Sequence, residues 1–210
     1  MRYNDKVPLM NKIKILLAIY AAPNKDSNSS ALLDEFCKGA EAGGATIEKI
    51  YLYDLHLPYF NYGNRKAEPP DDPQNKDVKM LEKQIMSASG LVIGSPVWNF
   101  SVPAILKNLL DRISYFGRVY KHEYSMKKQP NFTHLHCYYI FTYGVPWYGW
   151  LFDSLAYYHT KITMWYFGAH NHGLMKVSGC GNGSKNVVHA RPHLLQKAYN
   201  KGVRFAKYLS

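Results

Sequence analysis

The sequence is poor in cysteine. Its three cysteines, Cys37, Cys137 and Cys180, lie far apart and form no C-x-x-C pair. This spacing provides neither a disulfide framework nor a cysteine-rich metal site, so we expect a reducing compartment, the cytoplasm. It also argues against an iron–sulfur cluster, which normally needs more thiolate ligands than this chain has.

Long apolar runs are also missing. Residues 1–11 are polar, unlike the apolar part of a secretory signal. Proline and charged residues interrupt the aromatic region 137–167, so it lacks the run of about 18 apolar residues that a membrane span needs. We therefore expect no membrane insertion. The length of 210 residues and the apolar fraction of 47% predict a single domain over residues 1–210, with residues 1–11 as an N-terminal arm.

Acidic residues are few, and the formal net charge is +11. In isolation, such an excess would favour nucleic acid or an anionic surface as a partner. The basic residues are scattered from Lys12 to Lys207 rather than gathered into one run, which favours a solvated surface. We therefore expect no nucleic-acid partner, and a surface that favours phosphate-bearing cofactors.

Apolar segments alternate with helical patterns along the chain. Strands are expected over residues 12–20, 46–52, 91–94, 135–142 and 173–178. Helices are expected from residue 29, around residues 78–85, and over 102–113, 150–167 and 192–209. The alternation predicts an α/β fold, a doubly wound parallel sheet with helices on both faces. Ligands of such sheets bind beyond the carboxyl ends of the strands, so the loops after strands one, three and four are candidate site segments.

The first of these loops, residues 21–30, joins a buried strand to the start of a helix. The N–H groups and positive dipole at such a junction favour an anion, and Ser27, Asn28 and Ser29 add donors for phosphate oxygens. The same serines are ordinary helix caps. The loop alone leaves phosphate binding and simple capping equally open.

The second loop, residues 95–103, is apolar and aromatic where a plain connection would be polar. Val97, Trp98 and Phe100 are suited to cover a flat ring system, with Pro96 and Pro103 holding the backbone rigid. A hydrophobic loop tucked under a neighbouring helix would have the same composition. Both interpretations stay open at this point.

The triplet Ser27-Asn28-Ser29 and the stretch GSPVWNFSVPAILKNLLDRI, residues 94–113, resemble the flavodoxin-like NAD(P)H-dependent FMN reductases, quinone reductases and azoreductases. The resemblance covers nearly the whole chain and is weakest over residues 54–75. It implies a five-stranded flavodoxin-like sheet of order 2-1-3-4-5. It further implies that the triplet holds the phosphate of FMN. The flavin ring contacts that it implies are Pro96, Val97, Trp98, Asn99 and Phe100, with further contacts from Thr142, Tyr143, Gly144 and Val145.

Two positions in the first loop depart from the pattern of this family. Ala22 and Asn24 stand where many relatives of the Gly-Ser-Pro-Arg type carry serine and arginine. The departure leaves the detail of phosphate binding open.

The resemblance implies an enzyme that oxidises NADH or NADPH and passes the hydride through FMN to a small planar acceptor: a quinone, an azo compound or free flavin. Because the flavin carries this chemistry, no side chain is named as the catalyst. Two alternatives stay open. One is an FMN electron carrier without nicotinamide activity, whose typical acidic surface is absent here, and the other is a binding module that has lost FMN.

Aromatic residues are dense in segment 143–167, beyond what one helix can bury against its own sheet. An aromatic-rich internal core is one explanation. Together with the resemblance, the density predicts a homodimer in which this segment and the 96–100 loop wall the cleft above the flavin.

Two histidine pairs complete the candidate residues. His134 with His136, and His170 with His172, alternate along extended segments, so the members of each pair share a face. Without a nearby carboxylate or cysteine pattern we expect no metal site. The glycine-rich segment 179–185 satisfies neither nucleotide-binding fingerprint and predicts a turn.

Overall fold

The computed structural model describes residues 13–60, 76–113, 116, 131–145, 154–181 and 187–209. Its centre is a parallel sheet of five strands in the order β2-β1-β3-β4-β5, which confirms the expected doubly wound topology. The strands are β1 (Ile15–Tyr20), β2 (Thr46–Tyr51), β3 (Gly90–Pro96), β4 (His136–Thr142) and β5 (His170–Val177). The expected arm, residues 1–11, lies outside the described residues.

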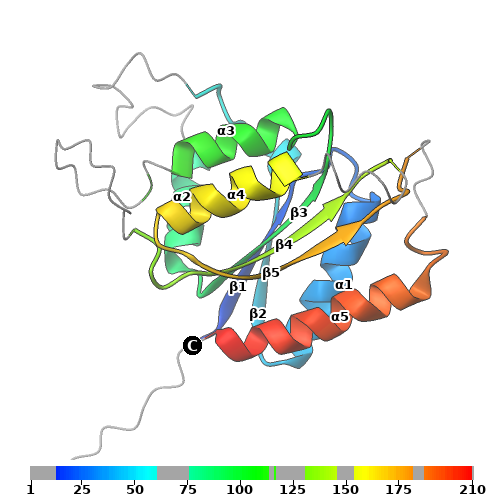
Figure 1. Ribbon diagram of the computed structural model, residues 1–210. Helices are drawn as coiled ribbons and strands as arrows, with labels where there is room; N and C mark the ends of the chain where they lie inside the picture. The colour runs from blue at the N-terminus through cyan, green and yellow to red at the C-terminus, as the bar shows by residue number, and fades with distance from the viewer. Residues whose placement is uncertain are drawn as a thin grey trace, which may run out of the picture.

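Helices cover both faces of the sheet (Figure 1). One face carries α1 (Asn28–Ala42) and α5 (Pro192–Phe205). The other face carries α2 (Lys76–Ser87), α3 (Ala104–Ile113) and α4 (Ser154–Tyr166). Two short 3-10 helices, η1 (Leu52–Asp54) and η4 (Ala206–Tyr208), follow β2 and α5. Within the described ranges, no helix has the length and apolar character needed to span a bilayer.

The central strand β1 is covered by helices on both of its faces, which explains the continuous apolar run in this part of the sequence. Leu17 and Ile19 pack towards α2 and α3, whereas Leu16 and Ala18 pack towards α1 and α5. All four side chains are fully buried. A parallel strand that is covered on both faces has to be apolar at every position, so it appears as a continuous apolar run.

The two histidine pairs meet at the amino ends of β4 and β5. His136 Nδ1 lies 2.6 Å from His172 Nε2, and the rings of His136 and His170 stack with centroids 5.2 Å apart. Partial burial and the neighbouring imidazoles lower the pKa of His136 and of His172. Among the residues described, no group of three or more side chains is placed to hold a metal ion.

We expect the free energy of unfolding to decrease as the pH falls from about 7.5 to about 5. The pKa of both His136 and His172 lies below the ordinary value of 6.5 that applies in the unfolded chain. The unfolded chain therefore takes up protons first, and stability present above pH 6.5 is lost as the pH falls through the folded-state pKa values.

Urea titrations at several pH values measure this slope. His172→Gln should flatten it, whereas His193→Gln, at an exposed position of α5, should leave it unchanged. If His172→Gln leaves the slope of stability against pH unaltered, the pH dependence does not come from the lowered histidine pKa values.

Candidate functional site

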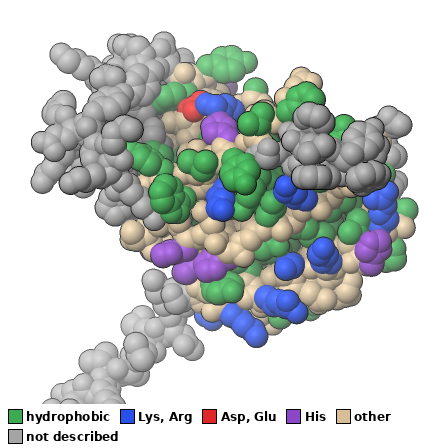
Figure 2. Space-filling model, viewed as in Figure 1, with side chains coloured by type: hydrophobic (Ala, Val, Ile, Leu, Met, Phe, Trp, Pro, Cys, Tyr) green, Lys and Arg blue, Asp and Glu red, His purple; other side chains and the backbone are tan. Residues whose placement is uncertain are grey.

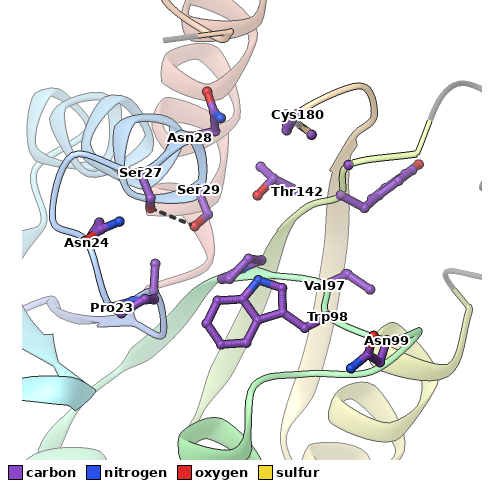
Figure 3. Close-up of a pocket in the computed structure, with 15 residues that line it drawn as sticks. Pro23, Asn24, Ser27, Asn28, Ser29, Val97, Trp98, Asn99, Thr142 and Cys180 are labelled. Atoms are coloured by element: carbon purple, nitrogen blue, oxygen red, sulfur yellow. Dashed lines mark hydrogen bonds between the residues drawn. The ribbon is translucent and has the colours of Figure 1, made fainter. Parts of the chain in front are cut away.

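The carboxyl ends of the central strands open onto a cavity of about 630 Å³ (Figure 3). It lies at the point where the strand order reverses, between β1 and β3, which is where doubly wound sheets bind their ligands. Its volume falls within the range of cofactor pockets. The lining residues come from the loops after β1, β3, β4 and β5: Ala22, Pro23, Asn24, Ser27, Asn28, Ser29, Pro96, Val97, Trp98, Asn99, Thr142, Tyr143, Gly144, Cys180 and Gly181.

The loop after β1 leads into α1, whose N-cap residue is Ser27. Ser27 Oγ accepts a hydrogen bond from the Ser30 N–H at 3.2 Å and lies 3.1 Å from Ser29 Oγ. Both Ser27 and Ser29 also line the cavity. The two interpretations that the sequence left open are therefore compatible, because the cap orients a helix start whose N–H groups and dipole lie at the cavity wall.

Asn28 differs from its two neighbours. Its Oδ1 accepts a hydrogen bond from the Val188 N–H at 3.1 Å, and Figure 3 shows its side chain directed away from Ser27 and Ser29. This bond ties the start of α1 to the turn that precedes α5. The side-chain oxygen of Asn28 therefore serves the fold at the cavity wall.

The described cavity wall contains no charged side chain. Lys25, in the first loop, forms an exposed ion pair with Asp54 at 2.6 Å instead. An anion in this cavity would be held by serine hydroxyls, by the Asn24 amide and by the helix dipole, rather than by an ion pair.

The loop after β3 contains a tight hairpin. Trp98 and Ser101 exchange two backbone hydrogen bonds of 2.9 Å, and the residues between them, Asn99 and Phe100, have φ values of 48° and 66°. This is a two-residue turn with the positive φ angles of type I′, which favours asparagine at the first position and glycine at the second. The turn therefore presents Trp98 and Asn99 to the cavity with a backbone that is hydrogen-bonded on both sides.

Phe100 occupies the turn position that favours glycine, and its ring is 54% exposed. We expect Phe100→Gly to raise the free energy of unfolding by about 1 kcal/mol, because the left-handed conformation costs a bulky residue roughly 1–2 kcal/mol. The larger entropy of glycine in the unfolded chain offsets part of the gain. Urea unfolding measures the change. Phe100→Ala removes the ring but keeps the backbone strain, so equal stability of the two variants would contradict this explanation.

The loops after β4 and β5 are joined to each other at the cavity. The Cys180 N–H donates to the Tyr143 carbonyl at 2.9 Å. Gly144 and Gly181 approach so closely that a Cβ on Gly181 would lie 2.8 Å from the Gly144 carbonyl oxygen. These contacts bring Cys180 and Gly181 into the cavity wall.

Ten of the twelve residues predicted as flavin contacts line this cavity. The other two, Phe100 and Val145, are 54% and 41% exposed and are not among its lining residues. Sequence reasoning missed Cys180 and Gly181, since segment 179–185 was expected to be only a turn. These two residues follow the carboxyl end of the fifth strand, and the rule that such loops bind ligands could have predicted them. Residues 182–185 lie outside the described part of the chain.

The cavity is built for binding rather than for acid–base chemistry. The Cys180 thiol is half-buried, and burial raises its pKa, so it stays protonated near neutral pH and is a poor nucleophile. The remaining lining residues are apolar, amide or hydroxyl groups. Such a wall can hold and orient a flat molecule that bears an anionic end.

The sequence profile of the family described as "Flavodoxin-like fold" matches residues 14–200. An FMN-dependent NADH:quinone oxidoreductase of Ruegeria pomeroyi is 30% identical over 118 residues, which are 50% of this chain and 58% of that protein. One of Legionella pneumophila is 48% identical over 85 residues, covering 35% and 41%. An iron-sulfur flavoprotein of Archaeoglobus fulgidus is 25% identical over 101 residues, covering 48% and 46%. The chain thus spans about half the length of these curated relatives.

Solved structures share the fold over almost their full length. An azoreductase from Bacillus anthracis str. Sterne superimposes with a TM-score of 0.67 at 20% identity, covering 92% of this chain and 99% of that one. An NAD(P)H:quinone oxidoreductase from Methanothermobacter marburgensis gives 0.69 at 19% identity, covering 91% and 98%. At these identities the likeness establishes the fold alone.

Proposed function

The chain belongs to the flavodoxin-like fold family, and on that basis we propose that it is an FMN-dependent oxidoreductase. It takes a hydride from NADH or NADPH and delivers it to a small planar acceptor: a quinone, an azo compound or free flavin. One observation carries the proposal: a single cavity joins a serine-lined helix start to an apolar, aromatic loop at the reversal point of the sheet. The names of two relatives, FMN-dependent NADH:quinone oxidoreductases, support it.

The two ends of the cavity match the two ends of FMN. Ser27 and Ser29 at the start of α1 suit the phosphate, and Pro96, Val97 and Trp98 suit the ring. The bond between Asn28 and the turn before α5 closes the wall behind the phosphate end. FMN therefore fits better than FAD, whose adenylate extension needs room beyond the phosphate.

The residues of the chain bind and orient the cofactor. When bound, FMN supplies the hydride chemistry. The Val97 N–H donates to the Thr142 carbonyl at 2.7 Å, which holds the ring-binding loop against the end of β4. Trp98, 46% exposed at the cavity, provides an apolar surface that excludes water from one side of the site. Nicotinamide and acceptor are proposed to stack in turn on the open side, so no side chain is assigned as the chemical catalyst.

Flavin loading and turnover test the proposal directly. Protein incubated with FMN and desalted should retain the yellow absorbance and oxidise NADH or NADPH when a soluble quinone or azo dye is added. FMN retention without nicotinamide turnover would indicate an electron carrier, and no retention would indicate a binding module. Mass analysis of the released flavin separates FMN from FAD. We also propose that no iron–sulfur cluster is present, which stoichiometric iron in the same sample would contradict.

We propose in addition that two copies form a dimer through the exposed side of α4. This helix carries a row of apolar residues three and four positions apart, each 51–63% exposed: Leu155, Tyr158, Ile162 and Trp165. An apolar row of this kind invites aggregation unless another surface covers it, and a second copy provides a matching surface. The predicted contribution of residues 146–153 lies outside the described residues.

Light scattering tests the dimer. The wild type should be monodisperse at about twice the chain mass of 24.1 kDa, and Ile162→Lys should shift it towards the monomer. A wild-type mass near 24.1 kDa would contradict the dimer.

The remaining expectations concern compartment and domain organisation. The three cysteines are free thiols, and two of them are buried. Such thiols suit a reducing compartment, and on this ground we propose the cytoplasm.

One domain over residues 1–210 stays a prediction, supported by the single sheet to which all five strands belong.

A further inference from the structure

The carboxyl-terminal part of the chain has no acidic residue. Residues 154–210 contain neither Asp nor Glu, but they contain eight basic residues: Lys161, Lys176, Lys185, Arg191, Lys197, Lys201, Arg204 and Lys207. The ion pairs formed between described residues all lie within residues 25–111. The excess positive charge of the protein is therefore concentrated in its carboxyl-terminal part.

Helix α5 and the η4 turn place half of these charges on one side. Lys197, Lys201, Arg204 and Lys207, here named the basic row, follow one another three or four positions apart. The opposite side of α5 is buried against α1. Figure 2 shows Lys and Arg side chains gathered over α5 on the face of the molecule that it presents.

The shape of this surface suits an extended partner. A shallow hollow of about 320 Å³ runs along the exposed side of α5 from His193 to Arg204. The distance from His193 to Lys207 is about 20 Å at 1.5 Å per helical residue. A row of this length presents several cations side by side, which suits a surface or a polymer of repeated negative charge better than a single anionic group.

We propose that the basic row docks the protein on a lipid bilayer that carries anionic headgroups. Because α5 is packed against α1 along its inner side, its outer side is exposed along its length and only shallowly hollowed, so a planar surface can reach all the cations of the row. Tyr208 directly follows the row; one side of its ring stacks on His172, and the residue is still 48% exposed. Tyrosine is enriched at the level of the headgroups. Lys and Arg side chains near an anionic membrane add attraction that falls off within a Debye length.

The turn before α5 lies beside the candidate site, and from there the basic row runs towards the amino ends of β4 and β5, where the Tyr208 ring stacks on His172. The turn that precedes α5 contains Val188, whose N–H bonds to Asn28 in the cavity wall. The docking itself does not depend on the proposed activity.

Vesicle sedimentation at low ionic strength tests this proposal. Vesicles of phosphatidylcholine with about 30% phosphatidylserine should bind the wild type, and pure phosphatidylcholine vesicles should not. Lys197→Gln with Lys201→Gln should lower the partition coefficient on the order of 30-fold, about fivefold per lysine. The matched control is Lys79→Gln with Lys83→Gln, an exposed pair at the same spacing on α2, on the other face of the sheet, which should keep the binding.

Three outcomes would overturn the proposal. In the first, the wild type fails to sediment with anionic vesicles. In the second, the α2 variant loses as much binding as the α5 variant, which would show that binding depends on net charge alone. In the third outcome, the α5 lysines are needed for a duplex oligonucleotide that binds more tightly than the vesicles, which would assign the basic row to nucleic acid. NADH oxidation with a soluble quinone, measured without vesicles, should be equal in both variants, so the proposed activity is tested separately.

Discussion

Alanine at both Ser27 and Ser29 is expected to weaken FMN binding by about 30-fold or more. The two hydroxyls lie 3.1 Å apart at the cavity wall. A hydrogen bond to a charged phosphate contributes roughly 1.5 kcal/mol, so two sum to about 3 kcal/mol, and partial compensation by the remaining donors leaves an expected loss of about 2 kcal/mol or more. The N–H groups and dipole of α1 remain, so binding is weakened rather than abolished. Titration followed by flavin fluorescence measures the dissociation constant.

Ser30→Ala is the matched control for this prediction. Ser30 lies in the same helical turn, and its hydroxyl is 2.9 Å from Ser27 Oγ, but it is not part of the cavity wall. Its loss should leave the FMN affinity within about twofold. Because Ser27 is the N-cap, the double variant also loses about 1 kcal/mol of stability, so the titration is done where all variants are folded. Unchanged affinity in the double variant would place the phosphate elsewhere.

Most of the fold could be predicted because the central strands are covered on both faces. The residues of β1 and β4 have to be apolar at successive positions, and the sequence displays them as runs. The start of β5 is the exception, since the expected strand begins at Gly173 and the observed one at His170. As an edge strand, β5 is only partly covered, and its polar first residues do not form an apolar pattern.

The site could be predicted at the level of loops but not of every side chain. The rule for doubly wound sheets selects the loops after β1, β3 and β4 without knowledge of any contact. The turn that moves Phe100 out of the cavity wall depends on two positive φ angles that composition does not reveal. The bond from Val188 to Asn28 joins residues 160 positions apart, and only the folded chain shows it.

The packing of α1 on α5 is a second feature that the sequence hides. Gly39 and Gly202 lie inside helices, where glycine costs about 1 kcal/mol relative to alanine. In the structure they lie where the two helices touch backbone to backbone. A Cβ on Gly202 would lie 2.0 Å from the Phe36 carbonyl oxygen, and a Cβ on Gly39 would lie 2.0 Å from that of Tyr199.

Gly202→Ala is therefore expected to lower the free energy of unfolding by about 2 kcal/mol. The obstacle is a backbone oxygen, which cannot rotate away, so the helices have to separate and loosen contacts such as Phe36 on Phe205, whose ring centroids are 5.6 Å apart. Overpacking typically costs 1–3 kcal/mol, which exceeds the helix-propensity gain of about 1 kcal/mol. Asn200→Ala, at an exposed position of the same helix, should stay within about 0.5 kcal/mol of the wild type in urea unfolding.

Gly39→Ala tests the same contact from α1 and should cause a similar loss. The double variant should lose less than the sum, because the first methyl group already separates the helices and the second enters the space so opened. Strict additivity, or a Gly202→Ala protein as stable as the wild type, would show that each helix adjusts locally. Since Ser27 at the start of α1 and Val188 before α5 are held by the same pair of helices, separation should also weaken FMN binding in both single variants, whereas Asn200→Ala should not.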